Sequence, residues 1–255
     1  MNIAIIAAAG QGTRMDGGRA KQFLELAGTP IIIHTLRRFE QCDDIHELVV
    51  VLPAQDVADF VALADDYSLR RPLQVVAGGE TRSESVWRGL QSVKASAKDI
   101  IVVHDGVRPF VAVDEISSTI RAAEKYGAAI LAAAVTDTIK VIQDHNVKQT
   151  FDRNRLRRAL TPQCFRYELI RRAYQQAPDG GLDATDCSVL VERIGEVVSI
   201  VEGHPRNIKI TRKEDLAYGE ILMREDAEGR TQNTGVRTQN TGHRTQDDEE
   251  ETTSF

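Results

Sequence analysis

The segment NIAIIAAAGQGTR, residues Asn2–Arg14, decides how the fold of this 255-residue chain is interpreted. An apolar run of strand length, Ile3–Ala9, leads directly into a loop that contains Gly10 and Gly12. A glycine loop after the first strand of a parallel sheet is a common phosphate site, because backbone N–H groups there can point at the ligand. The segment therefore predicts an α/β fold with an anion site at the end of its first strand.

Two common phosphate-binding motifs do not fit this loop. The dinucleotide pattern GxGxxG requires a glycine where the chain has Met15, which disfavours an NAD-dependent oxidoreductase. The P-loop pattern, counted from Gly12, requires a lysine where the chain has Gly18. What remains is a glycine loop followed by two cations, Arg14 and Lys21. These cations either bind a phosphate or are solvated residues beside a tight turn between a strand and a helix.

Beyond this loop, strand-length apolar runs alternate with amphipathic stretches of helix length. This order predicts a mostly parallel sheet with helices on both faces. The predicted strands are Ile3–Ala9, Leu48–Leu52, Leu73–Ala77, Ile100–Val103, Ala128–Val135, Val198–Glu202 and Asn207–Thr211. One predicted helix begins at Thr29-Pro30 with Thr29 as its N-cap, and the others are Gln55–Asp65, Ser83–Val93, Asp114–Tyr126, Tyr167–Ala177, Thr185–Ile194 and Lys213–Arg224. Within 136–161, two short runs around the polar turn Gln143–Asn146 predict a projecting β-hairpin.

Residues 225–255 differ in composition from the rest of the chain. They contain the seven-residue repeats RTQNTGV, RTQNTGH and RTQDDEE, and their charge is 3 − 8 = −5, which leaves −6 + 5 = −1 for residues 1–224. No heptad position carries paired apolar residues, so a coiled coil is not predicted. These polar residues bury too little surface to offset chain entropy. We predict one domain over 1–224 followed by a disordered acidic repeat tail over 225–255.

Composition excludes several classes of protein. A net charge of −6 argues against a protein that wraps nucleic acid. No apolar run approaches the ~20 residues of a membrane span, and the N-terminus lacks the charged start of a signal peptide. The three cysteines, Cys42, Cys164 and Cys187, are far apart and form no CxxC pair, so we expect buried thiols in a cytoplasmic protein.

A second candidate site lies where the strand Leu73–Ala77 passes into a helix. Gly79, Glu80 and Ser85 lie in the segment GGETRSES, whose small residues allow a base or a ribose to approach closely. Alternatively, Ser83 in the same segment is only the N-cap of the helix.

Two further candidates are charged residues at or near strand ends. Asp105 follows the strand Ile100–Val103, where a carboxylate can hold a sugar hydroxyl or the outer shell of Mg²⁺. Alternatively, Asp105 and Arg108 form a structural ion pair. Lys209 alternates with Ile208 and Ile210, so it lies either in a site or on a solvated face.

Taken together and in this order, nine segments resemble the 2-C-methyl-D-erythritol 4-phosphate cytidylyltransferase family over nearly all of 1–224: AAAGQGTRM, KQF, GGETRSES, HDGVRPF, VTDTIK, DRN, ALTPQ, ATDC and NIKIT. The resemblance implies a Rossmann-like nucleotidyltransferase fold whose β-arm, about 136–161, clasps a second subunit of a homodimer. It implies transfer of CMP from CTP to the methylerythritol phosphate, with Mg²⁺. The products would be pyrophosphate and 4-diphosphocytidyl-2-C-methyl-D-erythritol, an intermediate of the non-mevalonate isoprenoid pathway.

The resemblance also assigns roles to individual residues. Arg14 and Lys21 match the pair that stabilises the transition state. The CTP site would comprise Ala7, Ala8, Ala9, Gly10, Gly79, Glu80 and Ser85. The acceptor site would comprise Asp105, Arg108, Thr138, Arg153, Thr161, Thr185 and Lys209, with Arg153 and Thr138 supplied by the other subunit. The metal would be carried mainly by the CTP phosphates, with Asp105 as a candidate protein contact.

One departure leaves the polyol phosphate acceptor open. The family usually has an acidic residue after the Thr-Asp pair, whereas Thr185-Asp186 is followed here by Cys187, which is more typical of ribitol-5-phosphate cytidylyltransferases. The segments AAAG, VTDTIK and Asp152–Asn154 favour the methylerythritol enzyme. A non-catalytic nucleotide-binding regulator is the alternative of another class, although base recognition alone does not require two cations at the α-phosphate.

Overall fold

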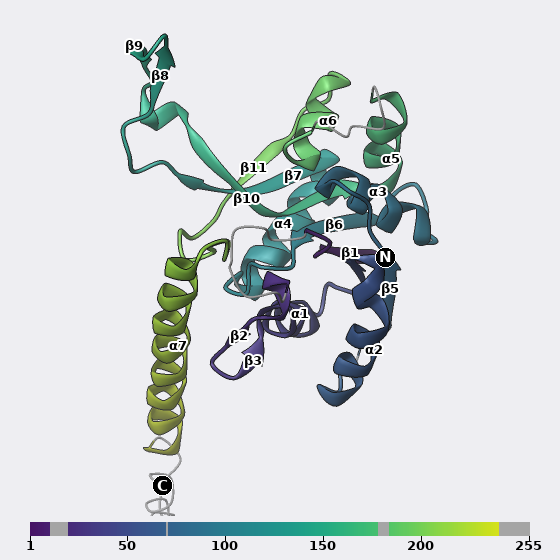
Figure 1. Cartoon of the computed structure of the whole chain (residues 1–255), viewed down its shortest axis with the longest axis vertical. Coiled ribbons are helices and arrows are strands. Elements are labelled where there is room, and N and C mark those ends of the chain that lie inside the picture. Colours follow the sequence, from purple (N-terminus) through teal and green to yellow (C-terminus); the bar gives the residue numbers. More distant parts are fainter. Residues whose placement is uncertain (11–19, 70, 178–183, 240–255) are drawn as a thin grey trace, which may run out of the picture.

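A seven-stranded sheet forms the centre of the molecule, with the strand order β11-β7-β10-β6-β1-β4-β5 (Figure 1). The computed structural model describes residues 1–10, 20–69, 71–177 and 184–239, with side chains up to Glu228. The strands are β1 (Asn2–Ala7), β4 (Glu47–Leu52), β5 (Leu73–Ala77), β6 (Ile100–Asp105), β7 (Ala128–Ala134), β10 (Arg157–Arg166) and β11 (Ser199–Glu202). Among these strands β10 alone runs opposite to its neighbours, β6 and β7. The predicted α/β class with a mostly parallel sheet is confirmed.

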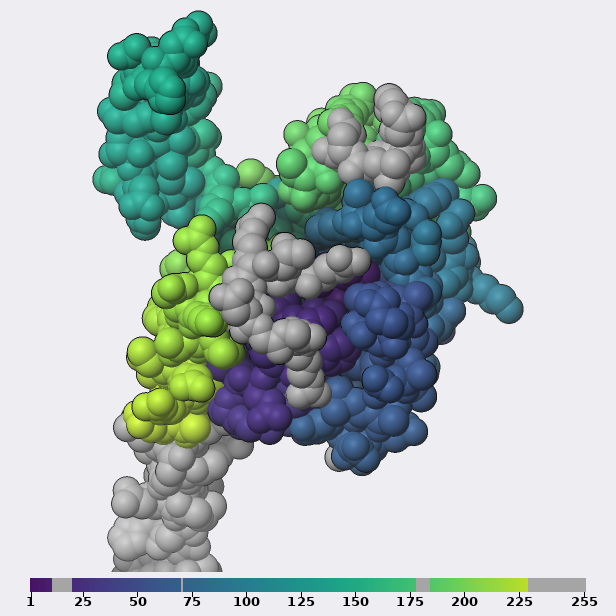
Figure 2. Space-filling view, viewed as in Figure 1, coloured from purple at the N-terminus to yellow at the C-terminus, as the bar shows by residue number. Residues whose placement is uncertain are grey.

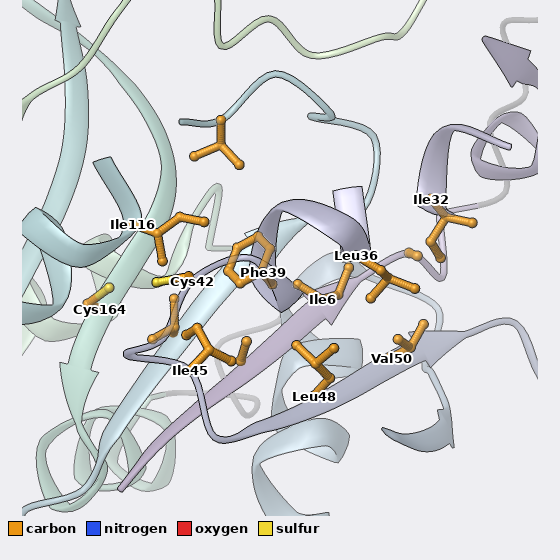
Figure 3. Packing of buried hydrophobic residues seen from close by; sticks show 14 of the residues in the cluster. Ile6, Ile32, Leu36, Phe39, Cys42, Ile45, Leu48, Val50, Ile116 and Cys164 are labelled. Carbon is orange, nitrogen blue, oxygen red and sulfur yellow. The ribbon is translucent and has the colours of Figure 1, made fainter. Parts of the chain in front are cut away.

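Helices cover both faces of this sheet, as the two-sided apolar strands predict. Ala4 and Ile6 of β1 pack into a core with α1 (Ile31–Glu40), α2 (Val57–Asp66) and α4 (Val113–Tyr126). Ile3 and Ile5 pack on the opposite side with α3 (Arg82–Ser92), α5 (Tyr167–Gln176) and α6 (Cys187–Arg193). In Figure 3, Leu36 and Phe39 of α1 lie against Ile6, Leu48 and Val50 of the sheet. The period of two along β1 thus divides its side chains between two cores.

The strand register brings several strand ends together at one edge of the sheet. Ala7, the last residue of β1, pairs with Asp105, the last residue of β6. Ala7 also pairs with Val51 of β4, and Leu52 pairs with Ala77, the last residue of β5. In an open α/β sheet this carboxyl edge is where ligands bind.

A two-stranded sheet separate from the central one forms a hairpin, β8 (Lys140–Gln143) with β9 (Asn146–Thr150). Every residue of both strands except Val141 is exposed. Figure 1 shows the hairpin far from the helices that cover the sheet, and the space-filling view shows it standing clear of the main body on that face (Figure 2). The range 136–161 assigned to the arm is too long, because β10 begins at Arg157 and pairs with β7 of the central sheet.

Three local predictions were wrong. Thr29 does not cap α1: Thr29–Pro30 form β3, which pairs with β2 (Glu25–Leu26), and the N-cap is Pro30. Ser83 is not the N-cap of α3, because Thr81 accepts the Glu84 N–H at 3.1 Å. Residues 207–211 form no strand: Ile210 N–H donates to Val107 O at 2.9 Å, whereas the backbone bonds from Asn207 to His204 and from Ile208 to Arg206 are local turns.

The last helix, α7 (Lys213–Gln239), continues past its predicted end at Arg224. Asp226 accepts hydrogen bonds from Arg38 Nη2 at 3.0 Å and from Arg206 Nη2 at 2.9 Å. These ion pairs attach the first acidic residues of the segment 225–255 to the body of the protein. No proline follows Pro205, so nothing in the backbone chemistry stops the helix at Arg224.

Candidate functional site

A pocket opens at the carboxyl edge of the sheet, between the ends of β1 and β6 and the start of α3. It collects residues that are far apart in the sequence: Ala7, Ala8, Ala9, Gly10, Lys21, Gln22, Arg82, Ser85, Asp105, Val107 and Lys209. Lys21 belongs to a single 3-10 turn, η1 (Lys21–Phe23). The structure therefore brings together residues that the sequence assigned to both substrates. Arg14 lies outside the described residues.

Asp105 is the electrostatic centre of this pocket. It is 5% exposed, and three cations from separate segments converge on its carboxylate. The contacts are Arg82 Nε to Oδ1 at 2.9 Å, Lys209 Nζ to Oδ2 at 3.0 Å and Arg108 Nε to Oδ2 at 3.2 Å. Burial alone would raise the pKa of Asp105, but the three cations outweigh it and hold that pKa well below its ordinary value. One carboxylate facing three cations leaves the pocket with an excess of positive charge.

A buried hydrogen-bonded network supports Asp105 from behind. His104 Nε2 lies 3.1 Å from the carbonyl oxygen of Arg108, which can only accept, so Nε2 carries the proton. His104 Nδ1 therefore accepts from the Thr161 hydroxyl at 3.0 Å. The same hydroxyl accepts the Asp105 N–H at 3.2 Å. Thr161 is 4% exposed, so its position beneath Asp105 suits it to holding the end of β6.

His104 makes the stability of the fold dependent on pH. Burial lowers the pKa of His104 from 6.5 to about 3. The group stays neutral in the folded protein but gains a proton in the unfolded chain below about pH 6.5, so this stability is present above pH 6.5 and lost as the pH falls toward 3. The shift corresponds to at most about 5 kcal/mol of unfolding free energy. Urea unfolding between pH 7.5 and 4 should show this decline.

The matched variants for this prediction are His104→Gln and His145→Gln. His104→Gln lowers stability at neutral pH but should flatten the pH dependence, because the titrating group is gone. His145 is exposed at the hairpin tip, and its variant should keep the wild-type slope. An unchanged slope in His104→Gln would show that another group causes the acid sensitivity.

The segment after β5, which the resemblance assigns to CTP, is fixed by its own side chains. Ser85 Oγ accepts the Gly79 N–H at 3.1 Å and donates to the Thr81 carbonyl oxygen at 2.8 Å. Glu84 accepts the Glu80 N–H at 2.8 Å. Ser85 lines the pocket, whereas Gly79 and Glu80 are not among the residues that line it. A Cβ on Gly79 would collide with the Glu84 carboxylate, so a larger residue there would displace the group that accepts the Glu80 N–H.

Three predicted acceptor residues do not reach the pocket within this chain. Arg153 is exposed and donates from Nη1 to the Thr136 carbonyl oxygen at 2.8 Å. Thr138 is exposed on the hairpin side of the molecule, and Thr185 is exposed beside α6. Thr185 does not cap α6 either, because Asp186 accepts the Val189 N–H at 3.1 Å. Arg108 lies behind Asp105 and donates to the Asn207 carbonyl oxygen at 2.9 Å.

The sequence interpretation missed Arg82, Gln22 and Val107. Arg82 lies in the segment GGETRSES, and its position there distinguishes it from an ordinary surface cation. It is the first residue of α3, where the helix dipole disfavours a cation, so a specific partner is expected. Gln22 is 1% exposed, and its Nε2 has no hydrogen-bond partner among the described residues.

The described residues hold no cluster of three or more His, Cys, Asp or Glu side chains that could bind a metal ion. Both oxygens of Asp105 already accept from cations. The three cysteines are buried free thiols, as predicted. Within the described part of the chain, every helix is too short or too polar to cross a membrane.

Comparison with known proteins gives the family. A family model described as 2-C-methyl-D-erythritol 4-phosphate cytidylyltransferase matches residues 2–225. A relative of that name from Geobacillus thermodenitrificans is 42% identical over 86% of this chain and 96% of its own. Another from Acidobacterium capsulatum is 40% identical over 87% of this chain and 96% of its own.

Comparison with solved structures indicates the same family. The structure of 4-diphosphocytidyl-2C-methyl-D-erythritol synthase from Anaerococcus prevotii superposes with a TM-score of 0.77 at 31% identity, covering 88% of this chain and 96% of that one. The Thermus thermophilus cytidylyltransferase gives 0.69 at 31% identity, covering 87% and 98%. These names favour methylerythritol phosphate over ribitol phosphate as the acceptor.

Proposed function

Because this chain belongs to the 2-C-methyl-D-erythritol 4-phosphate cytidylyltransferase family, we propose that its pocket holds CTP and the methylerythritol phosphate side by side. The activity is transfer of CMP from CTP to that phosphate, with release of pyrophosphate, in isoprenoid precursor biosynthesis. The convergence of three cations on Asp105, beside the strand end Ala7–Gly10 and Lys21, is the observation that supports the proposal. Two anions can meet there because the site has more positive than negative charge.

The reaction is a direct in-line displacement at the α-phosphorus of CTP. An oxygen of the acceptor phosphate forms the new P–O bond while the bond to pyrophosphate breaks. The acceptor phosphate is already an anion at neutral pH, so the chain needs no general base to activate it. Lys21, with Arg14, stabilises the charge that develops at the α-phosphate. Lys209 and Asp105 hold the acceptor in line.

We propose Mg²⁺ as the cofactor, with the triphosphate oxygens as its main ligands. The site fits this arrangement, because Asp105 is the only carboxylate among the described residues that line the pocket and three cations already neutralise it. When bound, Mg²⁺ offsets the repulsion between the two substrates and the charge on the leaving pyrophosphate.

We further propose that the enzyme is a cytoplasmic homodimer joined through the hairpin. The hairpin and the segments at its base expose four large apolar side chains, Ile139 (38%), Ile142 (67%), Val147 (63%) and Phe151 (40%). A cluster of exposed apolar residues on a projecting element is typical of an interaction surface. Arg153 lies at the base of the same hairpin, where it is placed to serve the pocket of a second copy.

An assay of pyrophosphate release tests the function. With CTP and Mg²⁺, we expect rapid release with 2-C-methyl-D-erythritol 4-phosphate and at least about 100-fold lower kcat/KM with ribitol 5-phosphate, a discrimination of roughly 3 kcal/mol. Release only with ribitol 5-phosphate would establish the other acceptor. CTP binding without release in either reaction would establish a nucleotide-binding regulator.

Mixed dimers test whether Arg153 acts across the subunit interface. Lys21→Ala and Arg153→Ala should each be nearly inactive alone. After unfolding and refolding an equal mixture, we expect about a quarter of wild-type activity, because half of the dimers are mixed and each mixed dimer has one intact site. Mixing Lys21→Ala with a Lys209→Ala variant is the matched control. Both residues serve the same pocket, so no activity should return. No recovery in the first mixture would place Arg153 in its own chain's site or outside both sites.

A further inference from the structure

Arg82 has one side of its guanidinium held and the other side unused. Its Nε donates to Asp105 Oδ1 at 2.9 Å, and its Nη1 lies 3.6 Å from Cys187 Sγ. Its Nη2 is buried and has no hydrogen-bond partner among the described residues. A buried unpaired donor costs about 1–3 kcal/mol, more for a charged group. An arginine in that state beside a pocket is prepared to bind something that the pocket receives.

The charge on Arg82 is only partly compensated. Cys187 lies beside it, but burial raises the pKa of that thiol, so the sulfur is neutral and a weak acceptor. Asp105 is the one carboxylate in contact with the guanidinium among the described residues, and it is shared with Lys209 and Arg108. The guanidinium therefore retains attraction for an additional oxygen.

The position of Arg82 identifies which substrate provides that oxygen. Arg82 and Lys209 both line the pocket and both bind the carboxylate of Asp105, one on each oxygen. An acceptor held by Asp105 and Lys209 thus lies within the same group of charges as Arg82. Ser85, one helical turn along α3, lines the same pocket and is the residue assigned to CTP, so under the proposed function α3 spans the boundary between the two substrates.

We propose that Arg82 is a substrate-binding residue whose Nη2 donates to a phosphate or hydroxyl oxygen of the polyol phosphate acceptor. This inference rests on the proposed function. The guanidinium fork is what makes one residue suitable for both tasks: Nε fixes Asp105 while Nη2 binds the ligand. A lysine at the same position would keep one positive charge but lacks the planar fork that places one nitrogen at Asp105 and another at the ligand.

The Arg82→Lys variant distinguishes a role of Arg82 in binding the acceptor from a role in holding Asp105 alone. We expect the KM for the acceptor to rise about 10-fold or more, the scale for one hydrogen bond to a charged group, while kcat changes less. Calorimetric titration of the enzyme with CTP alone should give an affinity within about twofold of wild type, and titration with methylerythritol phosphate alone should show the loss. Arg121→Lys is the matched control, because Arg121 is exposed on α4 and lies 3.9 Å from Asp44, outside the pocket. It should leave kcat, the acceptor KM and both affinities within about twofold.

The outcomes are distinguishable. Normal acceptor KM and affinity in Arg82→Lys would overturn the proposal, since a single charge beside Asp105 would then suffice. An equal loss of CTP affinity would overturn the assignment to the acceptor and place the Nη2 bond on the nucleotide. Wild-type enzyme that binds both compounds but releases no pyrophosphate would contradict the proposed function, while the calorimetric comparison of Arg82→Lys with wild type still tests the bond.

Discussion

Lys21→Ala is expected to lower kcat by about 10²-fold or more, the scale for removal of one preorganised group that stabilises developing charge. Lys21 lies on the short turn η1 and lines the pocket with Gly10, next to the strand end where the triphosphate is proposed to lie. The charge at the α-phosphate grows only as the reaction proceeds. The loss should therefore appear mainly in kcat rather than in the affinity for CTP.

Single-turnover kinetics with saturating CTP and acceptor would measure the effect. Lys94→Ala is the matched control, because Lys94 is exposed near the end of α3 and outside the pocket. Its kcat should equal that of the wild type. A Lys21→Ala enzyme with turnover within about threefold of wild type would remove Lys21 from the mechanism.

Asp105→Asn is expected to impair both stability and activity. Asparagine keeps the shape of the side chain but removes the charge that holds Arg82, Lys209 and Arg108 together. Removal of one partner from a buried ion pair typically costs about 3–5 kcal/mol, and Arg108, with 12% of its side chain exposed, would keep its charge buried without this carboxylate. The free energy of unfolding in urea at pH 7 should fall by about 3 kcal/mol or more.

The effect of an added anion on the melting temperature is a second measurement on Asp105→Asn. Pyrophosphate should raise the melting temperature of Asp105→Asn more than that of the wild type, because the added anion takes the place of the lost carboxylate among the cations. Asp43→Asn is the control: Asp43 is exposed and lies 3.9 Å from Arg71, so its loss should change stability by about 0.5 kcal/mol or less. Wild-type stability in Asp105→Asn would show that the cations do not depend on this carboxylate.

The sequence was sufficient for the architecture because the relevant signals are local. The run Ile3–Ala7 is apolar on both faces, and the structure buries Ile3 and Ile5 on one side and Ala4 and Ile6 on the other. The position of Asp105 after an apolar strand placed it at the carboxyl edge of the sheet, where the structure has it beside Ala7. Burial of the three cysteines also followed from their spacing and surroundings.

The failures have two causes: a local strand pairing that competes with helix capping, and interactions whose partner is far away in the chain. The N-cap of α1 was misassigned because Thr29 pairs with Leu26 in a short hairpin, which competes with capping. Lys209 was assigned to a strand because its neighbours alternate, although the segment only crosses the sheet edge and supplies one backbone bond to Val107. The role of Arg82 depends on Asp105 and Cys187, and no pattern within the segment 78–85 contains those two residues.

The ion pairs of Asp226 show that the part of the chain bound to the body continues beyond Arg224. A boundary drawn where the composition changes, at residue 225, would cut between Arg224 and two residues that bind the body, Glu225 and Asp226. The helix that carries them, α7, has 27 residues and so spans about 40 Å. It begins four residues after Lys209 in the chain and extends away from the sheet (Figure 1). α7 is therefore attached to the body over its first half, and its far end at Gln239 lies well away from the pocket.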